Sequence, residues 1–211
     1  MRVRGRLITI EGLDGVGKTT VAVSLVGELR ARGAAVEALR EPGGVELSER
    51  IRTLVKDPAL AVDSRAEALL YAAARAQLCS ERVGPMLETG TWVLLDRFVD
   101  SSLAYQGAGR GLGVEAVRAI NAFATGGLQP DRTLLLRAEP ATRVARQAGR
   151  AEPPDRLERE DDAFFAAVAR AYDALAAAEP ARIRPVDASA PPDAVLAACL
   201  AELEDLLPQP A

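Results

Sequence analysis

Ten residues near the start of the chain carry the strongest chemical pattern. An apolar run at residues 7–10 is followed by Glu-Gly-Leu-Asp-Gly-Val-Gly-Lys-Thr-Thr, which fits the motif G-x-x-x-x-G-K-[ST]. Glycines adopt backbone angles that side chains forbid, so consecutive N–H groups can curl around a phosphate. The lysine can reach the β- and γ-phosphates, and the first threonine can bind Mg²⁺. This pattern predicts a nucleotide phosphate site made by Gly12, Leu13, Asp14, Gly15, Val16, Gly17, Lys18, Thr19 and Thr20.

A second apolar stretch ends in an acidic residue. Residues 91–95 are dense in Trp, Val and Leu, as a buried parallel strand should be, and Asp96-Arg97 follows them directly. This is the Walker B arrangement, in which a strand-end carboxylate lies near the Mg²⁺ of the phosphate loop. We therefore expect Thr19 and Asp96 to hold the metal ion, and Arg97 to project toward the same cleft.

The elements that must position these residues alternate between strand and helix. Strands are predicted at residues 7–10, 35–39, 91–95, 132–137 and 182–186, which favours an α/β fold with a five-stranded parallel sheet. Helices are predicted between them, beginning with residues 18–32 and ending with residues 192–207. The longest, residues 65–87, is predicted to start from an N-cap at Ser64 with Glu67 at the capping-box position, and Gly84-Pro85 is expected to kink or end it.

Polar side chains recur where the predicted sheet and helices face the same cleft. The loop Arg40-Glu41-Pro42-Gly43-Gly44 follows the second strand, at the edge of a parallel sheet where ligands bind, although it could also be a structural turn. Tyr71 and Arg75 share one helix face and could both contact a ligand in the cleft. The alternative is that they are amphipathic side chains at the rim of the core. One helical turn carries two hydroxyls and an amide, from Ser102, Tyr105 and Gln106. These groups could form hydrogen bonds with the edge of a base, or they could be a polar helix face in solvent.

The most charged stretch of the chain lies between residues 143 and 160. Such a run usually indicates a solvated surface segment. Gly149 and Pro153-Pro154, however, favour a hinge-flanked lid at about residues 146–158. Arginines on such a lid suit phosphoryl transfer, because they can neutralise the migrating group once water is excluded.

Composition excludes several classes of protein. The 211 residues suit one domain spanning the whole chain, and a net charge of −4 offers no basic field for nucleic acid. Histidine is absent, which excludes Ser-His-Asp catalysis and His-based zinc sites. Cys79 and Cys199 are expected to be ordinary thiols. No signal peptide or membrane span is predicted, so we expect a cytoplasmic enzyme that contacts no membrane.

With these motifs in place, the chain resembles the thymidylate kinases, which phosphorylate dTMP to dTDP, and in particular their bacterial form. The resemblance covers nearly the whole chain, and the order and spacing of its motifs are together very specific. It rests on the phosphate loop with Asp14 inside it, Arg40-Glu41-Pro42-Gly43-Gly44, Tyr71-Ala-Ala-Ala-Arg75, Asp96-Arg97-Phe98, Ser102-x-x-Tyr105-Gln106-Gly107, Gly127-Leu-x-Pro130-Asp131 and Asp155-Arg156-Leu157-Glu158.

The resemblance implies a P-loop NTPase-like three-layer fold that transfers phosphate from ATP to dTMP with Mg²⁺, a step in dTTP synthesis. Asp14 matches the carboxylate near the sugar 3′-hydroxyl, and Arg97 the arginine that binds the 5′-phosphate. Tyr71 stands where the family usually stacks a Phe on thymine, and Arg75 matches the residue that bonds the base O4. The full acceptor set implied for dTMP is Asp14, Arg40, Glu41, Arg52, Tyr71, Arg75, Arg97, Ser102, Tyr105 and Gln106.

The resemblance also concerns the source of the catalytic arginine. Some members carry an arginine in the phosphate loop where this chain has Gly15. Members with glycine there resemble a second type that supplies the arginine from the lid. Arg150 is then the first candidate, with Arg146 and Arg156 next, acting together with Lys18, Arg97 and Asp14. A homodimer formed through the long helices is also implied.

Two alternatives stay open on the sequence. One is another nucleoside monophosphate or deoxynucleoside kinase, which differs in its acceptor. The other is a GTP-binding switch module that uses the same phosphate loop. The chain has no N-K-x-D motif for reading guanine and no D-x-x-G after the third strand, which argues against the switch.

Overall fold

A five-stranded parallel sheet forms the centre of the computed structural model, which describes residues 4–148 and 153–207. The strand order is β2-β3-β1-β4-β5, and all four pairings are parallel. The predicted five-stranded parallel sheet is confirmed. The strands span Leu7–Glu11 (β1), Val36–Arg40 (β2), Trp92–Asp96 (β3), Arg132–Arg137 (β4) and Ile183–Asp187 (β5).

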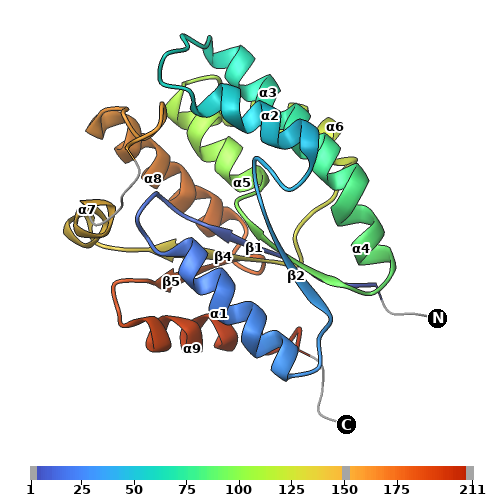
Figure 1. Cartoon of the computed structure of the whole chain (residues 1–211). Helices are drawn as coiled ribbons and strands as arrows, with labels where there is room; N and C mark the ends of the chain where they lie inside the picture. The colour runs from blue at the N-terminus through green and yellow to red at the C-terminus, as the bar shows by residue number, and fades with distance from the viewer. Residues whose placement is uncertain (1–3, 149–152, 208–211) are drawn as a thin grey trace.

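Helices cover both faces of the sheet (Figure 1). Most of their bounds agree with the predicted ranges, but the last helix ends at Ala201 and not at residue 207, and two π-helical segments interrupt the α-helices. The α-helices in the described residues are Lys18–Ala31 (α1), Glu46–Lys56 (α2), Ser64–Leu78 (α3), Gly84–Glu88 (α4), Val99–Ser102 (α5), Val114–Thr125 (α6), Pro140–Ala148 (α7), Asp162–Ala178 (α8) and Pro192–Ala201 (α9), and the π-helical segments are Cys79–Val83 (η1) and Leu103–Gly109 (η2).

Alternating side chains of the buried strands divide the core into two layers. Ile8 and Ile10 of β1 pack with α1 and α9 on one face. Leu7 of the same strand packs with η1 and α4 on the other. Successive side chains of a strand point to opposite faces, so a strand buried on both sides must be apolar at nearly every position. Figure 1 shows the resulting three layers, with α1 and α9 below the sheet and the remaining large helices above it.

The long helix predicted at residues 65–87 forms, but two of its details differ from the prediction. Its N-cap is Asp63, whose Oδ1 accepts from the Arg65 N–H at 3.0 Å, so the predicted cap at Ser64 is wrong. Ser64 is instead the first helical residue. Glu67 makes no capping box, because its buried carboxylate accepts from Gln106 and Arg110 instead.

The helix passes through the Gly84-Pro85 pair instead of ending there. Proline has no N–H and its ring crowds the carbonyl four residues back, so a regular α-helical turn cannot continue through it. The chain widens into the π-helical segment η1, in which the Gly84 N–H donates to the Cys79 carbonyl. Cys79 and Cys199 are both buried free thiols, as predicted.

No helix in the described part of the chain is long and apolar enough to cross a membrane. The carboxyl ends of the parallel strands gather at one edge of the sheet. There β1 leads into the phosphate loop, Arg40 and Asp96 end β2 and β3, and Glu41 and Arg97 follow them. In open parallel sheets, ligands bind at this edge.

Candidate active site

The phosphate loop joins β1 to α1 with the geometry that its glycines predict. Gly12, Gly15 and Gly17 have φ angles of 133°, 85° and 98°, in the region that favours glycine. A Cβ atom on Gly12 would lie 2.4 Å from the Leu136 carbonyl oxygen, so no other residue fits there. Helix α1 begins at Lys18, and its first N–H groups therefore face the loop as an anion site.

The Lys18 side chain folds back over the loop. Its Nζ donates to the Leu13 carbonyl at 2.9 Å and to the Gly12 carbonyl at 3.2 Å. Burial and the nearby Arg97 guanidinium lower the pKa of Lys18 to about 8. Gly12 and Leu13, predicted to bind phosphate, do not line the cleft; they hold the lysine instead.

Thr19 and Asp96 meet at the mouth of the loop, as predicted for a magnesium site. The Thr19 hydroxyl donates to Asp96 Oδ2 at 3.2 Å. Mg²⁺ is usually held by one or two protein oxygens and completes its shell with phosphates and waters. The described residues contain no cluster of three or more Cys, Asp or Glu that could hold a metal ion alone. The pair therefore fits a metal ion that arrives with a nucleotide.

Arg97 lies beside the phosphate loop. Its φ angle is 71°, a left-handed conformation that is uncommon outside glycine. Nη2 donates to Asp14 Oδ1 at 2.7 Å and to the Tyr105 hydroxyl at 3.2 Å, and Nη1 donates to Ser101 Oγ at 3.0 Å. The guanidinium therefore touches the loop that would hold the donor nucleotide.

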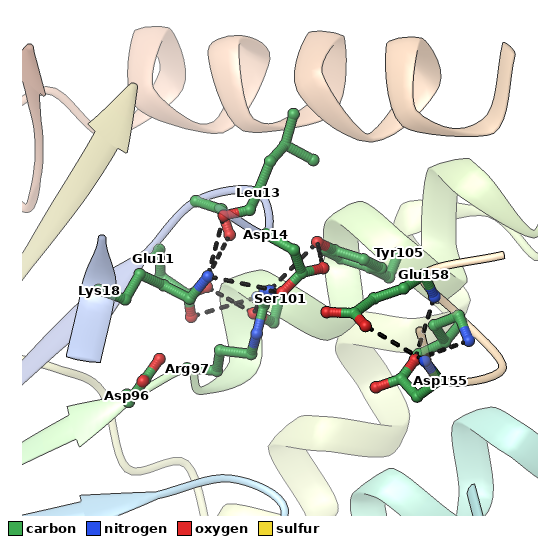
Figure 2. A network of polar contacts seen from close by, with 12 residues as sticks. Glu11, Leu13, Asp14, Lys18, Asp96, Arg97, Ser101, Tyr105, Asp155 and Glu158 are labelled. Atoms are coloured by element: carbon green, nitrogen blue, oxygen red, sulfur yellow. Dashed lines mark hydrogen bonds and ion pairs between the residues drawn. The ribbon is translucent and has the colours of Figure 1, made fainter. Parts of the chain in front are cut away.

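Asp14 lies between two cations (Figure 2). Oδ1 is 3.8 Å from Lys18 Nζ and 2.7 Å from Arg97 Nη2. Burial alone would raise the pKa of Asp14, but Arg97 and Lys18 outweigh it and hold this pKa well below its usual range. Lys18 and Arg97, the two side chains predicted to bind anions, thus both contact the Asp14 carboxylate.

The Glu11 side chain, which the sequence did not single out, fixes the segment after β3. One oxygen accepts from the Phe98 N–H at 2.7 Å, and the other accepts from the Ser101 hydroxyl at 2.6 Å and the Tyr172 hydroxyl at 2.8 Å. Burial, reinforced by Asp100, raises the pKa of Glu11. Glu11 therefore fixes Phe98, which follows Arg97 in the chain, and Ser101, whose hydroxyl accepts from Arg97. An acidic residue at the end of an otherwise apolar strand was the only available signal.

Arg75 of α3 lines the cleft but is almost fully buried. It is 2% exposed, and its Nε donates to Glu41 Oε2 at 2.7 Å. Nη1 donates to Ser102 Oγ at 2.9 Å and to Asn121 Oδ1, and Nη2 donates to the Phe98 carbonyl at 2.8 Å. Burial raises the pKa of Glu41 to about 7, against the pull of Arg75. The alternative of a side chain at the rim of the core is wrong for Arg75, which is fully interior.

One cleft of about 950 Å³ collects nearly all the predicted residues. The Tyr71 hydroxyl makes no hydrogen bond with the described residues, and burial raises its pKa. Arg52 Nη1 donates to the Pro42 carbonyl at 2.9 Å, and Arg40 pairs with Glu49. The cleft is lined from both sides by Asp14, Gly15, Val16, Gly17, Lys18, Thr19, Thr20, Arg40, Glu41, Arg52, Tyr71, Arg75, Asp96, Arg97, Ser102, Tyr105, Gln106 and Arg146.

The three arginines that were predicted to belong to a lid have different positions. Arg146 lines the cleft, and its Nη1 donates to the Val16 carbonyl at 3.1 Å. Arg156 points elsewhere: its Nε donates to the Val55 carbonyl at 3.0 Å, and its Nη2 lies 2.7 Å from Glu67 Oε2. Arg150 lies outside the described residues. Arg143, which was not predicted, donates to the Asp14 carbonyl at 3.0 Å, so α7 rests on the phosphate loop.

Comparison with known proteins agrees with this geometry. The family model "Thymidylate kinase" matches residues 10–198. The thymidylate kinase of Rhizorhabdus wittichii is 48% identical, covering 97% of this chain and 99% of that protein. Those of Deinococcus radiodurans and Lactobacillus delbrueckii subsp. bulgaricus are 50% and 46% identical, covering 90% and 98% of this chain and 92% and 99% of their own lengths.

The chain belongs to the thymidylate kinase family. The resemblance drawn from its motifs is confirmed, and with it the predicted enzyme class, an ATP-dependent nucleotide kinase. The GTP-binding switch is not favoured. A thymidylate kinase needs a donor phosphate site and an acceptor phosphate site that open to each other, and Lys18 and Arg97, the residues predicted for these two sites, line one cleft.

Proposed function

We propose that this cleft transfers the γ-phosphoryl group of ATP to dTMP, giving dTDP and ADP. One observation carries the proposal. Lys18 on the phosphate loop and Arg97 at the end of β3 share the carboxylate of Asp14, at 3.8 Å and 2.7 Å. Two cationic side chains this close together can bind two phosphates that face each other. Phosphoryl transfer requires this alignment.

The reaction needs no general base from the protein. The second pKa of a phosphate monoester is about 6, so the attacking oxygen of dTMP is already anionic at neutral pH. The absence of histidine is compatible with this chemistry. Lys18 and the loop amides bind the donor phosphates, and Arg97 aligns the acceptor phosphate. Thr19 and Asp96 would hold Mg²⁺, which neutralises charge on the β- and γ-phosphates when bound.

Arg146 is the described lid arginine that is best placed to join the transfer. Its contact with the Val16 carbonyl sets the guanidinium over the middle of the phosphate loop. Arg150 stays a candidate by its position in the lid sequence. Arg156 is a weaker one, because its guanidinium already contacts Glu67 and the carbonyl end of α2.

The acceptor base is proposed to lie between the Tyr71 ring and the polar groups of α3, α5 and η2. A tyrosine ring can stack on a pyrimidine as a phenylalanine ring does, and its hydroxyl has no competing partner among the described residues. Arg75 carries only hydrogen-bond donors, which suits the O4 carbonyl of thymine and opposes the amino group of cytosine. Ser102 and Gln106 complete the polar edge of the cleft.

An acceptor profile tests the proposal. Purified protein with MgATP is offered dTMP, dUMP, dCMP and dGMP separately, and ADP release is followed in a coupled assay. We expect turnover with dTMP to exceed that with the other three, and ATP to serve better than GTP as donor. A preference for dCMP or dGMP would assign the chain to another acceptor.

The working form is proposed to be a cytoplasmic homodimer. Phe123 on α6 is 93% exposed and Leu69 on α3 is 56% exposed, and these two helices pack against each other. Exposed large apolar side chains on neighbouring helices are typical of an interface. Sedimentation equilibrium should give twice the chain mass, and Phe123→Glu should shift it toward the monomer. A monomeric wild-type protein would contradict this arrangement.

A further inference from the structure

The carboxylate of Glu67 on α3 is the strongest feature without a role in the proposed reaction. Its side chain is fully buried. Oε1 accepts from Gln106 Nε2 at 2.9 Å and from Arg110 Nε at 3.2 Å. Oε2 accepts from Arg110 Nη2 at 3.0 Å and lies 2.7 Å from Arg156 Nη2. One carboxylate therefore joins α3, η2 and the end of the lid.

The guanidinium groups of Arg110 and Arg156 indicate that Glu67 acts as a hydrogen-bond acceptor. Two arginines lie against the Glu67 carboxylate, and a carboxylate has acceptor oxygens only. The part of Gln106 that faces Glu67 must then be the amide nitrogen. The carbonyl oxygen is the other end of this amide, and it accepts no hydrogen bond from the described residues. Gln106 itself lines the cleft, so this acceptor is available to a ligand.

We propose that Glu67 is a positioning residue that sets base specificity by locking the Gln106 amide with its carbonyl toward the acceptor base. The proposal rests on dTMP being the acceptor. Thymine has a donor at N3 and an acceptor at O4, whereas cytosine has an acceptor at N3 and a donor at N4. A free glutamine could rotate its amide by 180° and serve either base. The pairing with Glu67 removes that choice, since the rotated amide would set its oxygen against the carboxylate.

The lock works together with Arg75. Arg75 presents donors and Gln106 presents an acceptor, so the pair matches O4 and N3–H of thymine. Cytosine would meet a donor against its amino group and an acceptor against its N3. A site whose buried polar groups are left unpaired rejects a ligand far more strongly than a site that merely lacks a contact. Glu67 would thus act on the base without touching it.

Glu67→Gln tests the lock. The substituted side chain offers both a donor and an acceptor, so the Gln106 amide is free to rotate. We expect the ratio of kcat/KM for dTMP to that for dCMP to fall by about tenfold to a hundredfold. KM for ATP should stay within about twofold of wild type, because the phosphate loop lies elsewhere in the cleft.

Two further variants separate positioning from general damage. Glu160→Gln removes the other carboxylate on Arg110, 2.7 Å from its Nη1, without touching Gln106, and should leave base selectivity unchanged. The double variant E67Q/Q106E returns one carboxylate to the pair and fixes an acceptor at position 106. It should regain the preference for dTMP that E67Q loses. Should E67Q fail to fold, Glu67→Asp keeps the charge but draws the oxygens away from Gln106, with the same expected loss of selectivity.

The outcomes are distinct. If the wild-type protein does not phosphorylate dTMP, the proposed function fails first. If it does, and E67Q or E67D keeps the wild-type ratio of dTMP to dCMP, the lock is wrong. The same conclusion follows if KM for dTMP and KM for ATP rise together, or if E67Q/Q106E does not regain selectivity, since either result would indicate a purely structural role for Glu67.

Discussion

At the scale of single residues, the backbone of Arg97 is the unusual feature of the site. A non-glycine residue at φ 71° is held there by its surroundings: its own N–H donates to the Ile10 carbonyl at 3.0 Å, and the next N–H donates to Glu11. Conformations of this kind persist only where neighbouring contacts enforce them, and they cluster at functional sites. In this conformation the guanidinium contacts Asp14 of the phosphate loop and Tyr105 of η2.

The lowered pKa of Lys18 predicts how ATP binding depends on pH. Burial and the repulsion from Arg97 bring this pKa to about 8, so the ammonium is charged below that pH and neutral above it. A neutral lysine attracts phosphates less. KM for ATP should therefore rise above about pH 8, by up to about tenfold per pH unit. KM for dTMP should change less, because an arginine stays charged throughout.

Steady-state kinetics between about pH 7 and about pH 9, at saturating Mg²⁺, measure both constants on the same protein. A flat KM for ATP across that range would mean that Lys18 keeps its proton in the free enzyme. An equal rise in both constants would instead point to a loss of stability at high pH.

The residues of the site differ in how far the sequence could predict them. Lys18, Thr19 and Asp96 follow from local patterns, because a glycine loop and a strand end fix their surroundings within a few positions. Glu11 and Glu67 could not be identified that way. Their partners are 87 and 39 positions distant, at Phe98 and Gln106, and only the packed structure brings them together. The sequence pattern even favoured a different role for Glu67, in a capping box.

At the scale of elements, the docking of α7 on the phosphate loop predicts which described lid arginine acts in transfer. Arg146→Ala should lower kcat by about 10³- to 10⁵-fold, as removal of an arginine finger does. KM for dTMP should hardly change, since the acceptor phosphate is proposed to be bound by Arg97, which follows β3. Arg159, which among the described residues contacts only the Pro154 carbonyl and is exposed, is the matched control, and Arg159→Ala should keep wild-type turnover.

Single-turnover measurements on Arg146→Ala and Arg150→Ala, made side by side, decide between the two positions. Near-normal chemistry in Arg146→Ala, with a large loss in Arg150→Ala, would move the catalytic role to the second arginine. Loss in both variants would mean that the lid supplies two charges.

The start of α3 provides a prediction on stability. Asp63 caps the first turn by accepting from the Arg65 N–H, whereas Ser64 makes no such bond. Removing an N-cap leaves a backbone donor of the helix unsatisfied. Asp63→Ala should therefore lower the Tm of the protein, and Ser64→Ala should leave it nearly unchanged. Differential scanning calorimetry of the two variants measures this; the reverse order would restore Ser64 as the cap.

Most elements could be predicted because their periodicity is strong. Residues 114–125 and 132–137 form a helix and a strand over the predicted ranges, since each is bounded by glycines or by a change of pattern. The π-helical turns were not predicted. Pro85 indicated a break, but whether a helix ends or widens at a proline depends on what packs beside it, and here Cys79 and Val83 are held in the core.

At the scale of the whole molecule, the sheet topology creates the cleft. The order β2-β3-β1-β4-β5 places β3 beside β1, with Ile10 in register with Asp96. The phosphate loop and Arg97 leave these two neighbouring strands at the same edge, which is why one cleft contains both. The number of strands could be predicted from the sequence; their order could not, because neighbours in the sheet are far apart in the chain.

The central claim is that the donor and acceptor phosphates are bound in one continuous cleft. Calorimetric titration with a single compound in which adenosine and thymidine are joined through their 5′ ends by a chain of phosphates tests it most directly. If the two sites are continuous, the compound should bind once per chain and about 10²- to 10⁴-fold more tightly than dTMP, because its second half binds at a high effective concentration. An affinity no higher than that of dTMP or ATP alone, or two molecules bound per chain, would contradict the account.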